Sequence, residues 1–247
     1  MLIFYIYLFV LGTVIGSFLN VCIYRYQTNE PIAKGRSHCP KCNHQLAWYD
    51  LIPVFSWLSL KGKCRYCQSP IAIRYPIVEL LTGILYVLVF WKFKFTFDTL
   101  IYLVVVSTLV YAAFVDKDIM IIPDRTHIIL IVCGALLMLL HKESINERLI
   151  GLIIISIPLF IVAYITKGIG YGDVKLMTAI GLVIGFKNNI LAFLIGVILG
   201  AIVGIYKLKF KNSNKKDEMP LGPHLIVGIL ISIFIGTNLI NWYISLF

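Results

Sequence analysis

The sequence predicts an all-α polytopic membrane protein with about eight transmembrane helices and a zinc-ribbon-like loop on the cytoplasmic side. Of the 247 residues, 60% are hydrophobic and only 14% are charged, and the mean hydropathy is +0.90. These values lie well outside the range of soluble proteins, so a large soluble domain is excluded. The other two observations are a series of long apolar runs and one longer polar loop that carries paired cysteines.

Eight apolar runs are the candidate spans. They cover residues 1–24, 76–91, 98–115, 127–140, 149–165, 174–186, 190–206 and 221–247. A spanning helix needs about 20 mostly apolar residues, and a shorter one is tolerated beside a polar site or a water-filled cavity. The first run has no basic n-region and no small-x-small cleavage site, so we expect a retained span rather than a signal peptide.

The basic residues are distributed unevenly between the two sets of alternating loops. Loops 25–75, 116–126, 166–175 and 207–220 hold 17 of the 22 Lys and Arg residues. The positive-inside rule therefore places these loops, and the protein's chemistry, in the cytoplasm and both termini outside. The formal net charge of +10 then reflects topology and the anionic headgroups of the lipid bilayer, and no nucleic acid is predicted as a partner.

The first of these loops contains two CxxC pairs, Cys39 with Cys42 and Cys64 with Cys67, separated by 21 residues. This spacing is typical of four-cysteine zinc ribbons, in which four thiolates complete a tetrahedral shell around a structural ion. Two disulfides or a redox-active CxxC are the alternatives, and a reducing cytoplasm without a thioredoxin-like βαβ pattern disfavours both. We therefore expect structural zinc bound by all four cysteines.

Three aspartates lie at span ends on the expected cytoplasmic face. Asp116 ends the third run, Asp124 follows Pro123 just before the fourth, and Asp173 begins the sixth. Ionisable groups in or beside a span are unfavourable, and for that reason they indicate a functional site. Two carboxyl groups held together cannot easily both ionise, so they can share a proton and act as base and acid on a peptide bond.

The segment before Asp173 contains Gly170 and Gly172, which allow close approach of an extended peptide. For either aspartate alone a structural role stays open: Asp173 as a helix cap, and Asp116 as a residue at the membrane boundary. No GxSxG or HExxH motif accompanies the five scattered histidines, and only His127, close to Asp124, is a candidate supporting group.

Ordered motifs along nearly the whole chain resemble those of the type IV prepilin leader peptidases. They are Gly16-Ser17-Phe18-Leu19-Asn20-Val21 with Arg25, the two CxxC pairs, Arg74-Tyr75-Pro76-Ile77-Val78-Glu79-Leu80-Leu81-Thr82, Asp116 with Ile122-Pro123-Asp124, Gly170-Tyr171-Gly172-Asp173-Val174-Lys175-Leu176, and Pro220-Leu221-Gly222-Pro223. The resemblance implies a multi-pass aspartyl protease of the bacterial inner membrane that removes the basic leader of prepilins or pseudopilins at the cytoplasmic face. It implies Asp116 and Asp173 as the catalytic pair, and we place Asp124, Gly170, Gly172, Lys175 and Glu79 in supporting positions.

The resemblance also implies a second activity, N-methylation of the new N-terminus with S-adenosylmethionine as the methyl donor. No nucleotide-binding fingerprint locates that donor, so Glu79 and the cytoplasmic loop are only candidates for its site. We expect two domains. Residues 1–91 hold the first two spans and the four-cysteine zinc loop, and residues 98–247 form the membrane aspartyl peptidase domain.

Two alternative functions are an ion-coupled membrane transporter and a noncatalytic pilus-assembly scaffold with a zinc-binding loop. Transporters also place carboxylates in or near their spans. Many of them are built from internal repeats, however, and neither the GxGD segment nor the cysteine loop occurs a second time.

Overall fold

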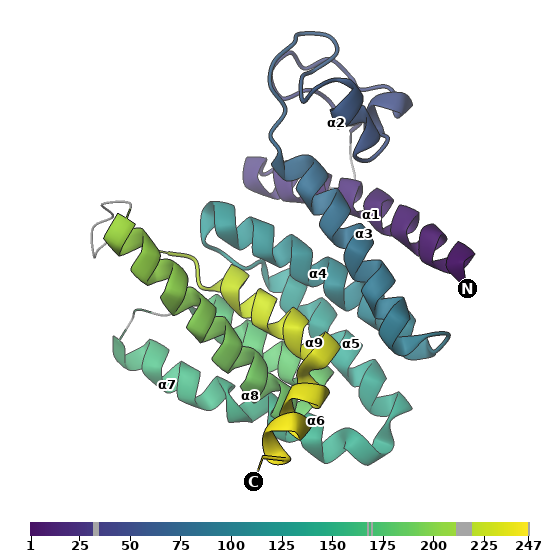
Figure 1. The fold of residues 1–247 in the computed structure, drawn as a ribbon. Helices are drawn as coiled ribbons and strands as arrows, with labels where there is room; N and C mark the ends of the chain where they lie inside the picture. The colour runs from purple at the N-terminus through teal and green to yellow at the C-terminus, as the bar shows by residue number, and fades with distance from the viewer. Residues whose placement is uncertain (32–34, 167, 169, 211–218, 247) are drawn as a thin grey trace. The chain divides into compact units, whose positions relative to one another are not determined.

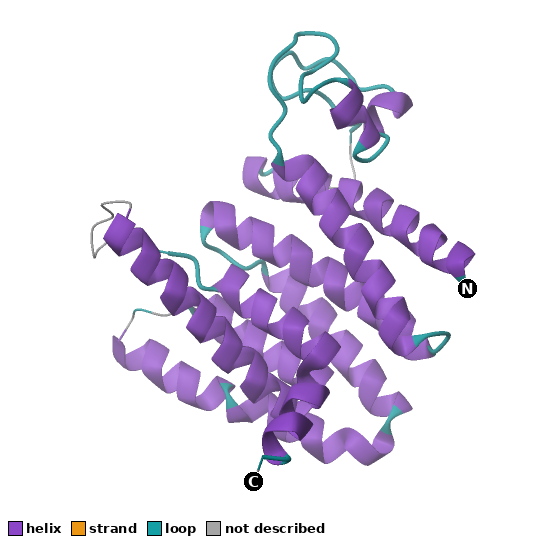
Figure 2. Cartoon of the chain, viewed as in Figure 1, coloured by secondary structure: helices purple, strands orange, loops and turns teal. Residues whose placement is uncertain are grey.

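The computed structural model describes residues 1–31, 35–166, 168, 170–210 and 219–246. In this part of the chain every regular element is a helix, and the only β-structure is two isolated bridges (Figure 2). The expected all-α fold is thus confirmed. The chain forms two compact units, Met1–Thr99 and Leu100–Phe247. Five lysines that contribute to the charge asymmetry lie outside the described residues: Lys34, Lys167, Lys211, Lys215 and Lys216.

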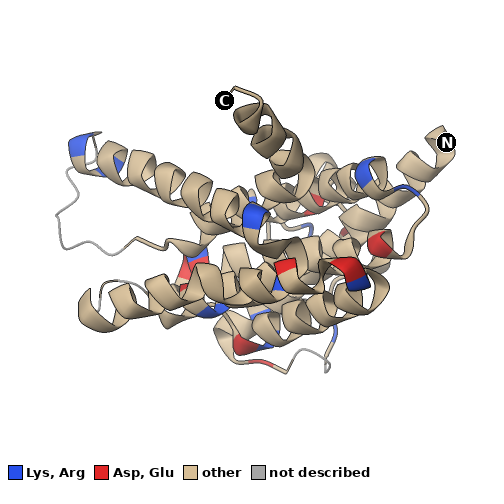
Figure 3. Ribbon diagram, turned by 90° about the horizontal axis from the view of Figure 1, so that it is seen from below, with Lys and Arg blue, Asp and Glu red and all other residues tan. Residues whose placement is uncertain are grey.

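Six helical segments are long and apolar enough to cross a membrane, judged by length and composition. They are α1 (Leu2–Thr28), α3 (Arg74–Phe93), α4 (Phe97–Ile119), the segment Lys142–Thr166, α8 (Tyr171–Phe210) and α9 (Gly222–Ile244). α5 (Asp124–Leu140) has only 17 residues, and the 40-residue α8 is two helices joined across a kink. When α5 and the two parts of α8 are each counted as a span, the number agrees with the expected eight or so. Figure 3 shows how few charged residues the helices carry.

In the first unit, α1 and α3 pack together through glycines. A Cβ atom added to Gly12 would lie 2.8 Å from the Gly83 Cα, and one added to Gly16 would lie 2.7 Å from the Glu79 Cα. Glycine lets two helix backbones approach this closely, which is a common way for helices to associate in lipid. Between them the chain forms two short helices, η1 (Trp48–Leu51) and α2 (Phe55–Ser59) (Figure 1).

In the second unit, prolines divide the helices. Pro123 is extended and directly precedes α5. Pro158 has no N–H to donate, and its ring crowds the carbonyl group four residues earlier. That residue is Ile154, at which α6 (Ile145–Ile154) ends. The expected single span 149–165 is therefore two helices, α6 and α7 (Ser156–Thr166), preceded by the short η2 (Lys142–Ser144).

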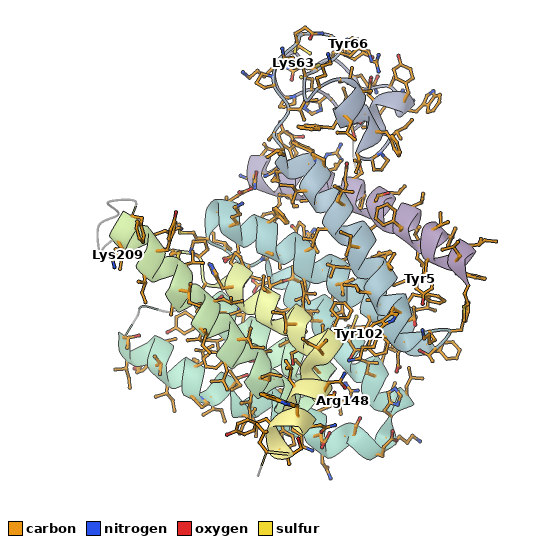
Figure 4. The ribbon with its side chains drawn as sticks, viewed as in Figure 1. Tyr5, Lys63, Tyr66, Tyr102, Arg148 and Lys209 are labelled. Carbon is orange, nitrogen blue, oxygen red and sulfur yellow. The ribbon has the colours of Figure 1, made fainter. Side chains whose placement is uncertain are left out.

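α8 is kinked at Gly185, whose φ of 75° and ψ of 170° are not helical. A kink leaves backbone carbonyls without their helical partners, and at membrane depth side chains must supply the missing donors. The Tyr102 hydroxyl donates to the Val183 carbonyl at 3.3 Å, and Arg148 Nη1 donates to the carbonyls of Val183 and, at 2.9 Å, Leu182 (Figure 4). The kink separates the sixth expected span from the seventh.

Gly181 and Gly151 bring the backbones of α8 and α6 into contact, because a Cβ on Gly181 would overlap the Gly151 carbonyl group. Gly181→Ala should therefore destabilise the protein by about 1–3 kcal/mol, the usual range for overpacking. Thermal unfolding in detergent measures this as a lower Tm. Gly204→Ala is the control, since the nearest described atom outside its own helix would be the Met219 Cε, at 3.9 Å from the added Cβ. Equal Tm values for the two variants would contradict the packing role.

Candidate functional site

The two CxxC pairs fold into matching turns. In each, the N–H of the first cysteine donates to the carbonyl oxygen five residues later. The Cys39 N–H donates to His44 at 3.0 Å, and the Cys64 N–H donates to Ser69 at 2.8 Å. Each turn contains a residue with positive φ directly after its second cysteine, 55° at Asn43 and 58° at Gln68. The repeated geometry presents two thiols from each turn, as a zinc knuckle does.

The sulfur atoms of Cys39, Cys42, Cys64 and Cys67 all lie within 4.8 Å of one another. Four Zn–S bonds of about 2.3 Å in a tetrahedron place the sulfurs about 3.8 Å apart. The sulfurs of Cys39 and Cys67, one from each turn, are 3.9 Å apart. The donor set and its spacing therefore fit a structural zinc ion.

The thiols of this cluster compete for ionisation. Burial disfavours the Cys39 thiolate, but hydrogen bonds from the backbone N–H groups of Cys42 and Lys41 and from the thiols of Cys42 and Cys64 together lower the pKa of Cys39 to about 6. At Cys42 the backbone N–H of His44 favours the thiolate, yet desolvation and the neighbouring thiols of Cys39 and Cys67 raise its pKa to about 11. A divalent cation at the centre would relieve this repulsion and allow all four thiols to ionise.

The second unit holds two buried carboxyl groups. Asp116 lies in the last turn of α4 and is 5% exposed, and Asp173 lies in the first turn of α8 and is 7% exposed. The two groups are close enough for their charges to interact. Among the described residues, neither Asp116 Oδ2 nor Asp173 Oδ1 has a hydrogen-bond partner. Since buried polar atoms are nearly always satisfied, the two unpartnered oxygens make this pair a candidate functional site.

The position of Asp173 argues against a capping role. An N-cap residue precedes the helix, whereas Asp173 is the third residue of α8 and its own N–H donates to the Gly170 carbonyl at 3.0 Å. Among the described atoms outside its chain neighbours, a Cβ added to Gly170 would lie 3.6 Å from Asp173 Oδ2 and 4.0 Å from the Gly172 nitrogen. Gly170 therefore lies in direct contact with the Asp173 carboxyl group.

Gly222 is a site residue that sequence reasoning missed. The backbone of Gly222 lies against the Asp116 carboxyl group, because a Cβ at this position would lie 2.5 Å from Asp116 Oδ2. The Ile122 side chain contacts both glycine segments, lying 3.2 Å from a Cβ placed on Gly222 and 3.4 Å from one placed on Gly172. Two prolines bracket Leu221 and Gly222 directly before the last apolar run, and this pattern was the available signal.

Asp124 stands outside the buried pair. Its side chain is 75% exposed, and its Oδ1 accepts a hydrogen bond from Lys175 Nζ at 2.7 Å. His127, the expected supporting histidine, is buried, with Nδ1 3.7 Å from Asp124 Oδ1 and Nε2 3.2 Å from the Gly172 carbonyl oxygen. Asp124, His127 and Lys175 thus connect the start of α5 to the segment that carries Asp173.

Glu79 lies in the first unit, where it is 7% exposed. Its Oε2 accepts a hydrogen bond from the Val54 N–H at 2.8 Å, and Val54 has an unusual φ of 63° and ψ of −50°. A left-handed φ is unfavourable for a β-branched residue, so it needs support from its surroundings. The Glu79 carboxylate therefore helps to fix the cysteine loop to α3.

The fold and the two side-chain clusters define a class of protein: a polytopic helical membrane protein with a buried carboxyl pair beside glycine-containing chain breaks and a four-thiol cluster that fits a metal ion. Two family models match the chain, the bacterial peptidase A24 N-terminal domain over residues 10–93 and the type IV leader peptidase family over residues 103–205. The chain belongs to the type IV leader peptidase family.

Curated relatives extend the similarity over most of the chain. A prepilin leader peptidase/N-methyltransferase from Aeromonas hydrophila is 33% identical over 97% of this chain and 93% of its own length. Proteins of the same name are 37% identical in Myxococcus xanthus, over 87% of this chain and 68% of the relative, and 32% identical in Bacillus subtilis, over 97% of both. No solved structure was found to match the chain.

The wild-type protein should bind about one zinc ion per chain, and replacing Cys39 and Cys64 with serine should abolish binding, because each turn loses a ligand. Elemental analysis of the purified proteins measures this. Cys133→Ala is the control, since Cys133 is buried elsewhere, in α5, and its loss should leave the zinc in place. Acidification should also release the ion as the thiolates take up protons. Full zinc content in the double variant would rule out the four-cysteine site.

Proposed function

We propose that this chain is a membrane aspartyl endopeptidase that removes the basic leader of type IV prepilins or pseudopilins at the cytoplasmic membrane face and then N-methylates the new N-terminus. The observation that carries the proposal is the buried pair of Asp116 and Asp173, each with an unpartnered carboxyl oxygen. The substrate and the two reactions are supported by the name that the relatives carry, prepilin leader peptidase/N-methyltransferase.

The carboxyl pair supplies both the base and the acid for hydrolysis. Because neighbouring buried carboxylates repel each other, one holds a proton while the other is ionised. The ionised group takes a proton from water as the water oxygen attacks the scissile carbonyl carbon, and the protonated group donates to the carbonyl oxygen. The tetrahedral intermediate then collapses: the group that took the water proton donates it to the leaving nitrogen as the C–N bond breaks. The other carboxylate takes a proton from a hydroxyl of the intermediate as the carboxylic acid forms, so the pair again shares one proton.

Glycines give the scissile bond access to this pair. A peptide approaches an aspartyl site in extended form, and a glycine at position 170, in contact with Asp173 Oδ2, leaves no side chain of its own in the way. On the other carboxyl group, a side chain at position 222 would collide with Asp116 Oδ2, so glycine is needed there. These contacts support Gly170 and Gly222 as residues that shape the approach and hold the acid in place.

The cytoplasmic orientation rests on charge. Asp116 and Asp173 flank two of the loops in which Lys and Arg residues are concentrated, and the positive-inside rule assigns those loops to the cytoplasm of a bacterial inner-membrane protein. A leader that ends at the cytoplasmic boundary of a pilin helix would reach the pair from this side.

The second reaction would transfer a methyl group from the sulfonium of S-adenosylmethionine to the uncharged N-terminal amine, which releases a proton as the new C–N bond forms. This part of the proposal is supported by the relatives' name, since the chain has no nucleotide-binding fingerprint. Zinc has a structural role in the proposal, because four thiolates fill its tetrahedral shell and leave no position for a reactant.

Asp116→Asn and Asp173→Asn should each lower leader release by at least about a hundredfold, because asparagine keeps the volume but cannot carry the proton. The double variant should lose little more than either single variant, since the pair acts as one unit. The measurement is leader release from a purified prepilin in detergent, which neither a transporter nor a scaffold performs, with methylation of a pre-cleaved substrate followed in parallel.

The matched control for these variants is Asp98→Asn, in the first turn of the same helix as Asp116, which should cleave normally. Zinc content and Tm establish that each variant is folded. Near-normal cleavage by a folded Asp116→Asn or Asp173→Asn protein would overturn the proposed mechanism.

Asp124→Asn should reduce cleavage by only about twofold to fivefold, because an exposed ion pair contributes little. Lys175→Met should have a similar effect, and the double variant should be no worse than either, since each change breaks the same pair. Lys187→Met is the control, because it breaks the Lys187–Glu147 pair of 3.2 Å in another part of α8. A dead Asp124→Asn beside an active Asp116→Asn would move the first catalytic role to Asp124.

A further inference from the structure

The cysteine loop carries a group of exposed apolar side chains, which we call the aromatic edge. It consists of Trp48, Leu51, Ile52, Phe55 and Leu58, which are 76%, 40%, 41%, 74% and 58% exposed. The one charged residue in segment 46–60 is Asp50, whose Oδ1 accepts a hydrogen bond from Arg65 Nε at 2.8 Å. So much exposed apolar surface with so little charge indicates an interaction surface.

A hydrogen bond holds the aromatic edge at the level where a span begins. Val54 lies between Ile52 and Phe55, and its N–H donates to Glu79 Oε2 at 2.8 Å. Glu79 is in the second turn of α3, a candidate span that begins at Arg74. The residues on either side of Val54 therefore lie beside the first turns of a membrane helix.

The loop is polar and basic away from this edge. Lys41, Lys61 and Lys63 are exposed, and Figure 4 shows Lys63 and Tyr66 on the side of the loop that is far from α1 and α3. Exposed aromatic and aliphatic side chains beside a span, in a loop whose far side is polar and basic, are the pattern of segments that lie in the membrane interface.

We infer that the aromatic edge inserts into the interface of the bilayer that contains the chain's own spans, so that phospholipid is its partner. The loop that carries the two cysteine turns is then attached at three places: the end of α1, the start of α3, and the lipid-embedded edge between them in the sequence. Trp48 and Phe55 are the main anchors, because they are the most exposed members of the edge.

The test uses the full chain in nanodiscs of zwitterionic and anionic phospholipid, with acyl chains that are either brominated or unbrominated. The chain has four tryptophans, and subtracting the emission of each Trp→Phe variant isolates one of them. Bromine should quench Trp48 emission by about half, as expected for a side chain at the acyl boundary. Trp91, 55% exposed on α3, is the positive control.

Trp57 is the negative control, because its ring packs on Gly62 and its Nε1 donates to the Ile71 carbonyl at 3.2 Å within the loop. The inference is overturned if Trp48 has the same water-like emission in brominated and in unbrominated lipid. It is equally overturned if Trp48 is quenched no more than Trp57, or if added prepilin rather than lipid changes its emission, which would make the edge a substrate surface.

A second variant tests the attachment without tryptophan. Phe55→Ser with Leu58→Ser should speed tryptic cleavage after Lys61 about threefold or more, because the released loop samples open states, while the zinc content stays unchanged. Phe55→Trp keeps an interfacial aromatic and should cleave at the wild-type rate. An unchanged rate in the double serine variant would overturn the anchoring role of the edge.

Discussion

A peptide carbonyl inside a bilayer has no water to bond, and this constraint explains the polar contacts at the kink of α8. The kink at Gly185 occurs where Arg148 and Tyr102 donate to the carbonyls of Leu182 and Val183. Close by in the sequence, the buried Asn189 donates to the carbonyls of Gly151, at 2.8 Å, and Met177, at 3.2 Å. The irregular backbone of the kink is thus satisfied by polar side chains.

Three chain breaks lie beside the carboxyl pair of Asp116 and Asp173. They are the Ile122–Pro123 connection, the glycines before Asp173, and the turn at Gly222. A continuous membrane helix pairs its backbone groups internally, whereas a break leaves some of them for other partners. Each break contains a proline or a glycine, the residue types that end helices, so the residues that interrupt the helices also lie beside the carboxyl pair.

The sequence was informative wherever one local pattern determines the outcome. Apolar runs predicted the helical spans because such surface cannot remain in water, and the CxxC spacing predicted the thiol cluster because two tight turns supply four ligands. The division into α6 and α7 was missed, although Pro158 is visible in the run. The bond from Val54 to Glu79 and the contact of Gly222 with Asp116 could not be read, since each joins distant segments through tertiary packing. The catalytic roles of Asp116 and Asp173 stay predictions.

The glycine contacts between α1 and α3 turn the segment between Thr28 and Arg74 into a ring. Because Gly12 and Gly16 hold the two helix backbones together, the entropy of joining the ends of this segment is lost once, when the helices pair. Folding of the segment between the two helices is therefore an intramolecular step whose rate does not depend on protein concentration.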